Sequence, residues 1–177
     1  MAVRRRKATR QLTVAAILVA LGVVLLLLGT LVEVLDISAA AISSLLVVLA
    51  VIELKGKYPY LVYAATALLA MLLIPGNAAV MYLLFAGYYP ILKEKLEGHL
   101  SRPVAWVLKL AIFAVGCLAV FFVTVKLLLV SYTFATWHLL AIPLLAVVFV
   151  LYDVAMTRLI TAYFVRWRRH FRFLNKD

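Results

Sequence analysis

Hydrophobic residues fall into six long runs along the chain, and short polar breaks separate them. The breaks carry charged residues, glycine or proline, as in "ELKGKYP", "IPGN" and "KEKLEGHLSRP". Runs of about 20 apolar residues are long enough to cross the hydrocarbon core of a bilayer as α-helices. We therefore predict an all-α integral membrane protein, a single transmembrane domain over 1–177, with spans at 12–32, 37–52, 58–73, 78–92, 104–130 and 139–162 and basic tails at 1–11 and 163–177.

Composition supports this class of protein. Hydrophobic residues make up 68% of the chain, charged residues 14%, and the mean hydropathy is +1.14. A soluble domain of this size is excluded by such values. The first run is longer than the apolar region of a secretory signal peptide and ends in the acidic Glu33 and Asp36, so we expect it to be retained as the first span.

The basic residues predict the orientation. The net charge is +11, and Lys and Arg cluster at the ends of the apolar runs instead of along one polar face. Cytoplasmic loops of membrane proteins are enriched in Lys and Arg. Every basic break lies on one side if both termini are cytoplasmic, which predicts an N-in, C-in, multi-pass protein of the cell membrane. The same distribution argues for contact with the lipid bilayer and against nucleic acid as a partner.

A patch of small residues interrupts the first run. Ala16 and Ala20 are one helical turn apart, and Ala15 and Gly22 extend the patch. In lipid, small residues let two helix backbones approach closely, which is one of the few ways to form a tight helix contact. The patch predicts either an interface with another protein or packing against a span of the same chain, and the sequence favours neither.

The first run and its surroundings resemble a known family. A basic N-terminus leading into "RQLTVAAILVALGVVLLLLG", six short spans and the break "EVLDIS" are similar to the substrate-binding S components of energy-coupling factor (ECF) transporters. The segments "VIELKGKYPYLVYAATALLAMLLIP", "LFAGYYPILKEKLE" and "VLYDVAMTRLI" also resemble bacterial membrane proteins of S-component type.

This resemblance implies partners and a class of ligand. In S components an A-x-x-x-A motif of the first helix docks on the transmembrane coupling subunit, which works with ATPases, and Ala16 and Ala20 match that motif. The bound ligand would be a small, vitamin-like solute. No signature of a thiamine, biotin, riboflavin or cobalamin binder is present in the sequence.

A ligand taken from outside would meet the polar and aromatic residues of the predicted outer side. Lys126 is the one basic residue in the outer half of a span, and it suits an anionic group on a ligand. Its alternative role is snorkelling to the membrane interface, and for the aromatic residues the alternative is an interfacial belt. The candidate ligand-binding residues are Lys126, Trp137, His138, Tyr132, Asn77, Asp36 and Glu33.

One acidic residue lies inside the last span. An unpaired charge there would cost several kcal/mol, so Asp153 must be paired, neutral or hydrated. Lys109 is expected at a similar depth on the preceding span, and we predict a structural Asp153–Lys109 ion pair in preference to a proton relay.

Together these features predict the substrate-binding subunit of an ECF-type importer, with no catalytic activity of its own. The alternative is a membrane interaction or assembly protein without a small ligand. The chain lacks H-E-x-x-H, G-x-S-x-G and P-loop motifs, and its three histidines do not have the spacing of metal ligands, so we predict no enzyme, metal or cofactor.

Overall fold

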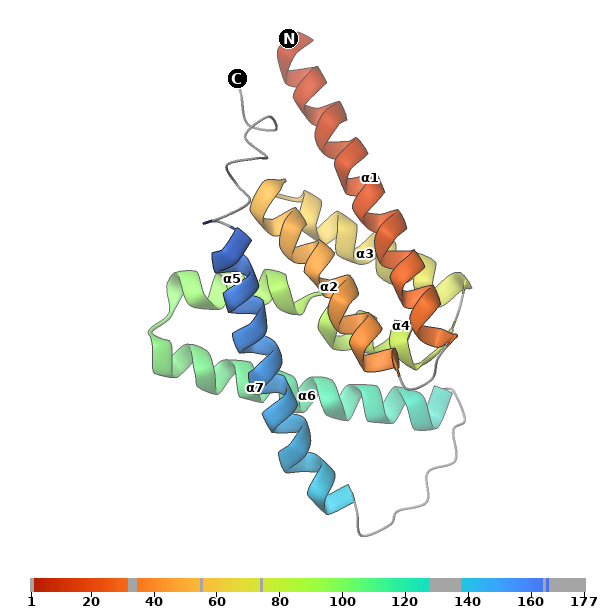
Figure 1. Cartoon of the computed structure of the whole chain (residues 1–177), viewed down its shortest axis with the longest axis vertical. Helices are drawn as coiled ribbons and strands as arrows, with labels where there is room; N and C mark the ends of the chain where they lie inside the picture. Colours follow the sequence, from red (N-terminus) through yellow and green to blue (C-terminus); the bar gives the residue numbers. More distant parts are fainter. Residues whose placement is uncertain are drawn as a thin grey trace. The chain divides into compact units, whose positions relative to one another are not determined.

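The computed structural model describes residues 2–31, 35–54, 56–73, 75–127, 138–163 and 165, with side chains for 8–31, 35–54, 56–73, 75–123, 143–163 and 165. The chain divides into two compact units, Met1–Tyr132 and Thr133–Asp177. The elements of the first unit are α1 (Ala2–Thr30), α2 (Asp36–Glu53), α3 (Tyr58–Leu73), α4 (Asn77–Met81), the π-helix η2 (Tyr82–Ala86), α5 (Tyr89–His99) and α6 (Arg102–Leu127). The second unit contains α7 (His138–Ala162) (Figure 1).

The described part of the chain is helical, in agreement with the all-α prediction. Within it, four helices are long and apolar enough to cross a membrane: Ala8–Thr30, Asp36–Glu53, Arg102–Val123 and Pro143–Ala162. They coincide with the first, second, fifth and sixth predicted spans. The third predicted span is the shorter apolar helix α3, whose 16 residues correspond to a length of about 24 Å.

The fourth predicted span, 78–92, was wrong as one continuous α-helix. It consists of α4, the π-helix η2, a turn at Gly87 and Tyr88, and the first residues of α5. The cause is Pro90, which lacks an N–H group and whose ring would collide with the carbonyl of Ala86 in an unbroken helix. The hydrogen bond from the Gly87 amide to the Tyr82 carbonyl, 2.8 Å long, closes the wider π turn before the break.

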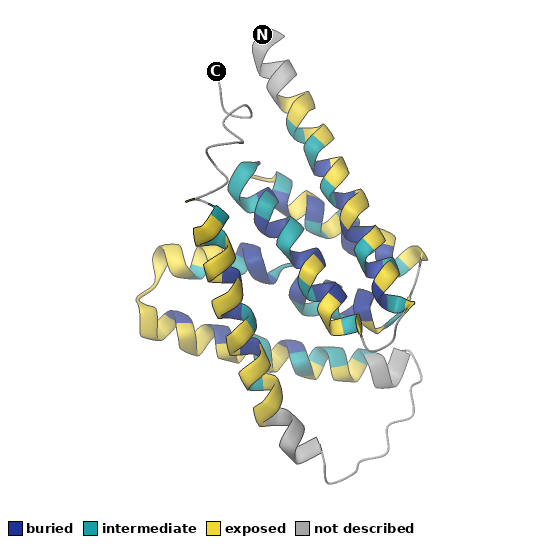
Figure 2. Cartoon of the chain, viewed as in Figure 1, coloured by how far each residue is buried: buried dark blue, intermediate teal, exposed yellow. Residues whose placement is uncertain are grey.

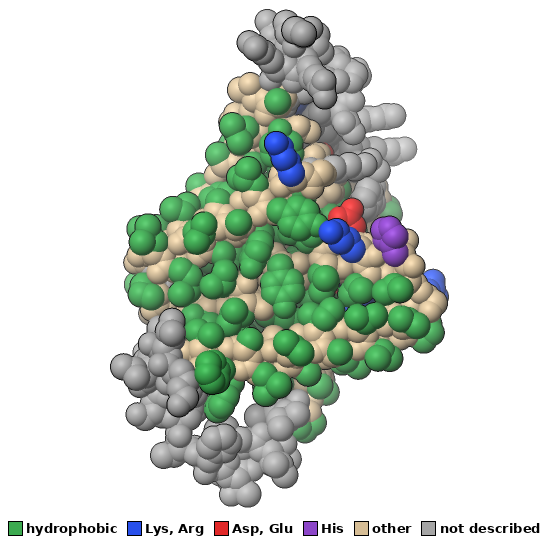
Figure 3. Space-filling view, turned by 180° about the vertical axis from the view of Figure 1, so that it is seen from behind, with side chains coloured by type: hydrophobic (Ala, Val, Ile, Leu, Met, Phe, Trp, Pro, Cys, Tyr) green, Lys and Arg blue, Asp and Glu red, His purple; other side chains and the backbone are tan. Residues whose placement is uncertain are grey.

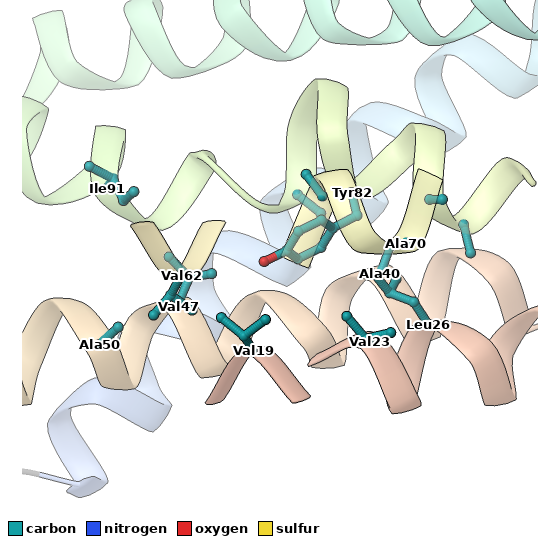
Figure 4. Packing of buried hydrophobic residues seen from close by; sticks show 14 of the residues in the cluster. Val19, Val23, Leu26, Ala40, Val47, Ala50, Val62, Ala70, Tyr82 and Ile91 are labelled. Carbon is teal, nitrogen blue, oxygen red and sulfur yellow. The ribbon is translucent and has the colours of Figure 1, made fainter. Parts of the chain in front are cut away.

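The core of the first unit lies between α1, α2, α3 and the α4–η2 segment (Figure 4). Ala15, Val19, Val23 and Leu26 recur every three or four residues on α1, and they form its buried side. Larger apolar residues cover the other side of α1, which is exposed (Figure 2). Because the chain is a membrane protein by composition, such an exposed apolar surface suits a lipid environment.

Two positions in and beside this core require glycine. Gly29 of α1 faces α2 so closely that a Cβ atom there would lie 2.2 Å from the Cβ of Ala39. Gly56, between α2 and α3, has a φ of 61°, in the left-handed region that glycine adopts without steric cost. These positions allow α1 and α2 to meet closely and allow the chain to turn sharply into α3.

Candidate functional site

The structure divides the small-residue patch of α1 into two parts. Ala16 and Ala20 are exposed, whereas Ala15 is fully buried and Gly22 is buried. The two inner residues, which were candidates for an interface with another protein, pack against the chain's own helices, the second of the two predicted alternatives. Ala16 and Ala20 are left as the candidates for an external contact.

The exposed pair lies on a face of α1 made of bulkier residues. Ile17 is 54% exposed and Leu21 is 49% exposed, and both flank the alanines. Small side chains between large ones leave a shallow depression along the helix, and a second helix can place its backbone there. The geometry therefore suits close helix–helix contact at Ala16 and Ala20.

Gly22 belongs to a buried polar cluster that sequence reasoning missed. The Ser43 hydroxyl of α2 donates a 3.2 Å hydrogen bond to the Gly22 carbonyl. Thr66 of α3 is so close that a Cβ atom at Gly22 would lie 3.0 Å from its Cγ2 atom, and the Tyr82 hydroxyl lies beside Thr66 and Ser43. Four elements thus meet at one polar point inside an apolar core, and Figure 4 shows the Tyr82 side chain directed into that core.

The π-helix has a polar contact of its own. The Tyr63 hydroxyl of α3 donates a 2.7 Å hydrogen bond to the Leu83 carbonyl. A π turn leaves carbonyl groups out of the regular i→i+4 pattern, and away from water such groups need another partner. The signals available in the sequence were the hydroxyl residues within apolar runs, namely Ser43, Tyr63, Thr66 and Tyr82.

Lys109 of α6 has an ion-pair partner that the sequence did not suggest. Its Nζ atom lies 2.5 Å from the Oε1 atom of Glu97 on α5, and the Nζ atom of Lys93 lies 3.2 Å from the same oxygen. Both lysine side chains are 3% exposed and that of Glu97 is 46% exposed. One half-exposed carboxylate therefore faces two buried ammonium groups, with the Trp106 ring 5.1 Å from Lys109 Nζ.

Asp153 lies on α7, in the second unit. The Thr157 hydroxyl, one turn later, donates a 2.8 Å hydrogen bond to the Asp153 backbone carbonyl. The two residues share a local helical contact, as is common for threonine in membrane helices. Because Asp153 and Lys109 belong to separate units, their ion pair stays a prediction.

The outer ligand-binding candidates are only partly within the described residues. Asp36 is half-buried in the first turn of α2, and Asn77 is exposed at the start of α4. Lys126 is in the last turn of α6 and His138 begins α7, but their side chains lie outside the described part of the chain. Glu33, Tyr132 and Trp137 also lie outside it, so the ligand site made of these residues stays a prediction.

A small apolar pocket lies in the core between α1, α3 and α4. It is lined by Val23, Leu26, Leu27, Thr30, Ala70 and Ala79 and does not admit a water molecule. Ligand sites for small organic molecules are usually hundreds of Å³ in volume and contain a few polar groups. In the described part of the chain this pocket is therefore a packing defect and not a solute site.

Comparisons with known proteins add no relative: no family model, no curated protein and no solved structure matches this chain.

Proposed function

We propose that this chain is the substrate-binding subunit of an ECF-type importer, made of six spans with both termini in the cytoplasm. The observation that carries this proposal is the exposure of Ala16 and Ala20 on a long apolar helix. It is supported by the contrast with Ala15, one residue away, which is fully buried in the core. In the proposed complex, α1 contacts a helix of the coupling subunit at this depression, and ATPases bind to that subunit.

Two substitutions on adjacent residues test the docking proposal. Ala16→Leu fills the depression with a bulky side chain, so it should abolish co-purification with a co-expressed ECF coupling subunit while the melting temperature stays within about 2 °C of wild type. Ala15→Leu places the same volume in a closed core, which typically costs about 1–3 kcal/mol, so it should lower the melting temperature. Retention of the coupling subunit by Ala16→Leu would contradict the proposal.

The orientation is tested with single cysteines. Cys117 is the only native cysteine and is first replaced by alanine. In intact cells, a membrane-impermeant maleimide should label a cysteine placed at the exposed Asn77 and should not label one at the exposed Gly98. Labelling at Gly98 alone would reverse the proposed orientation.

The second candidate function is a membrane interaction or assembly protein that binds no small ligand. It is favoured by the filled core of α1, α2, α3 and η2 and by the narrow apolar pocket beside it. Mass spectrometry of small molecules that co-purify with the protein separates the two candidates. A stoichiometric solute supports the importer subunit, whereas repeated recovery of protein and partner without a solute supports the assembly protein.

A further inference from the structure

A basic corner, defined here as Lys57, Tyr60 and Lys95, is formed at the start of α3 by the contact of Lys95 of α5 with Tyr60. The Lys95 Nζ atom is 5.2 Å from the centre of the Tyr60 ring. A hydrogen bond to the Tyr60 hydroxyl raises the pKa of Lys95, and the neighbouring Glu94 raises it further, so the group is an ammonium ion at neutral pH. Lys57 is exposed and lies three residues before Tyr60, on the same side of the helical turn.

An exposed apolar stripe begins at this corner and follows α3. Leu61 is one turn from Lys57, and Leu68 and Leu72 continue the same face with exposures of 69% and 79%. From Leu61 to Leu72 the stripe is about 17 Å long, close to half the thickness of a hydrocarbon core. Figure 3 shows a few basic side chains, one of them beside an acidic group, at the edge of a wide apolar surface.

We propose that the basic corner and this stripe bind one anionic phospholipid, with the headgroup phosphate between Lys57 and Lys95 and an acyl chain along α3. Two ammonium groups complement the charge of a phosphodiester, and lysine is a common phosphate ligand. A free phosphate ion is less suited, because both lysines are exposed and do not enclose a small anion. The apolar stripe directly beside the charges is what selects a lipid. This proposal does not depend on the importer function.

The test uses the full chain in detergent and native mass spectrometry with added dioleoyl phosphatidylglycerol or phosphatidylcholine. We expect wild type to retain one phosphatidylglycerol in preference to phosphatidylcholine. Each lysine near a membrane surface contributes about 1 kcal/mol, so Lys57→Gln and Lys95→Gln should each weaken binding about fivefold, and the double variant about 30-fold. Arg158→Gln is the matched control, since it removes one exposed cation from α7.

Each outcome of this experiment decides for or against the proposal. Equal retention of the two lipids by wild type would overturn it, as would unchanged phosphatidylglycerol binding in the double variant. Displacement of the lipid by millimolar glycerol phosphate or inorganic phosphate would show that the corner recognises a free anion, which would also overturn it. Thermal unfolding in phosphatidylcholine should be the same for wild type and the double variant, which confirms that any loss of binding is not a loss of fold.

Discussion

Glu97→Gln isolates the contribution of the carboxylate shared by Lys93 and Lys109. The substitution keeps the shape of the side chain and removes its charge, so both buried ammonium groups lose the opposite charge that faces them. Breaking a fully buried ion pair typically costs about 3–5 kcal/mol. Glu97 is 46% exposed, so water screens part of the interaction, and we expect a loss of about 1–3 kcal/mol.

This loss is measurable as a melting temperature. For a chain of this length, about 1 kcal/mol corresponds to about 2–4 °C, so Glu97→Gln should lower the melting temperature by about 2–12 °C. Unfolding can be followed with a thiol-reactive fluorogenic dye, because the half-buried Cys117 is the only cysteine. Glu94→Gln removes the same charge from the neighbouring exposed position and should shift the melting temperature by less than about 2 °C.

A double-mutant cycle shows whether the effect passes through Lys109. In a Lys109→Met background, one of the two ammonium groups is already gone, and Glu97→Gln should cost clearly less than in wild type. The reasoning fails if Glu97→Gln melts like Glu94→Gln. It also fails if the cost of Glu97→Gln is the same with and without Lys109.

Three further substitutions, the first with a matched control, test the packing and the outer site. Gly29→Ala should destabilise the protein by about 1–3 kcal/mol, because the new Cβ atom would lie 2.2 Å from an α2 side chain. Gly98→Ala is the control: Gly98 has open space around it, so its replacement should leave the melting temperature unchanged or slightly raised. Tyr63→Phe removes the hydrogen bond to the Leu83 carbonyl and should cost about 0.5–1.5 kcal/mol; an unchanged melting temperature would mean that the π turn needs no such partner. Lys126→Met should weaken binding of a co-purified anionic solute about ten- to a hundredfold if Lys126 contacts it, and an unchanged dissociation constant would assign this lysine to the membrane interface.

The long apolar runs were enough to predict the four membrane-length helices, since few other structures accommodate so many consecutive apolar residues. The break in the fourth run was also visible in the sequence, as Pro90 three residues after Gly87. It was missed because hydropathy was given more weight than the missing amide of proline. Run length therefore predicted the helices well and predicted their continuity poorly.

The sequence of α1 alone did not predict which side of the helix is buried and which is exposed. From Leu12 onward the helix has no polar face, so nothing in its own sequence indicates which residues point away from the core. Ala15 and Ala16 differ by about 100° of helical rotation, and only the packing of the other helices decides which of them is buried. Gly22 is an example, because the atoms that exclude a side chain there belong to Ser43 and Thr66.

The contact between Lys109 and Glu97 was missed for a related reason, while the Asp153–Lys109 pair stays a prediction. Only depth along the predicted spans was considered, and the segment that contains Lys93 and Glu97 was treated as a polar break between two spans. In the structure α5 extends through this segment to His99, and α6 begins at Arg102. The short turn between them brings the carboxylate of α5 against the ammonium group of α6, a contact that residue types alone do not reveal.

The hydrogen bond between Ser43 and the Gly22 carbonyl has a consequence for how the protein enters the membrane. Its two residues are 21 positions apart, on consecutive helices, so it can form as soon as the hairpin of α1 and α2 has left the translocation machinery. The Ser43 hydroxyl then has a partner in lipid before α3 and η2 are synthesised. Thr66 and Tyr82 arrive later, at a polar site that the first hairpin has already assembled. The hairpin of α1 and α2 is thus suited to form first, and the remaining helices of the first unit can then pack against it.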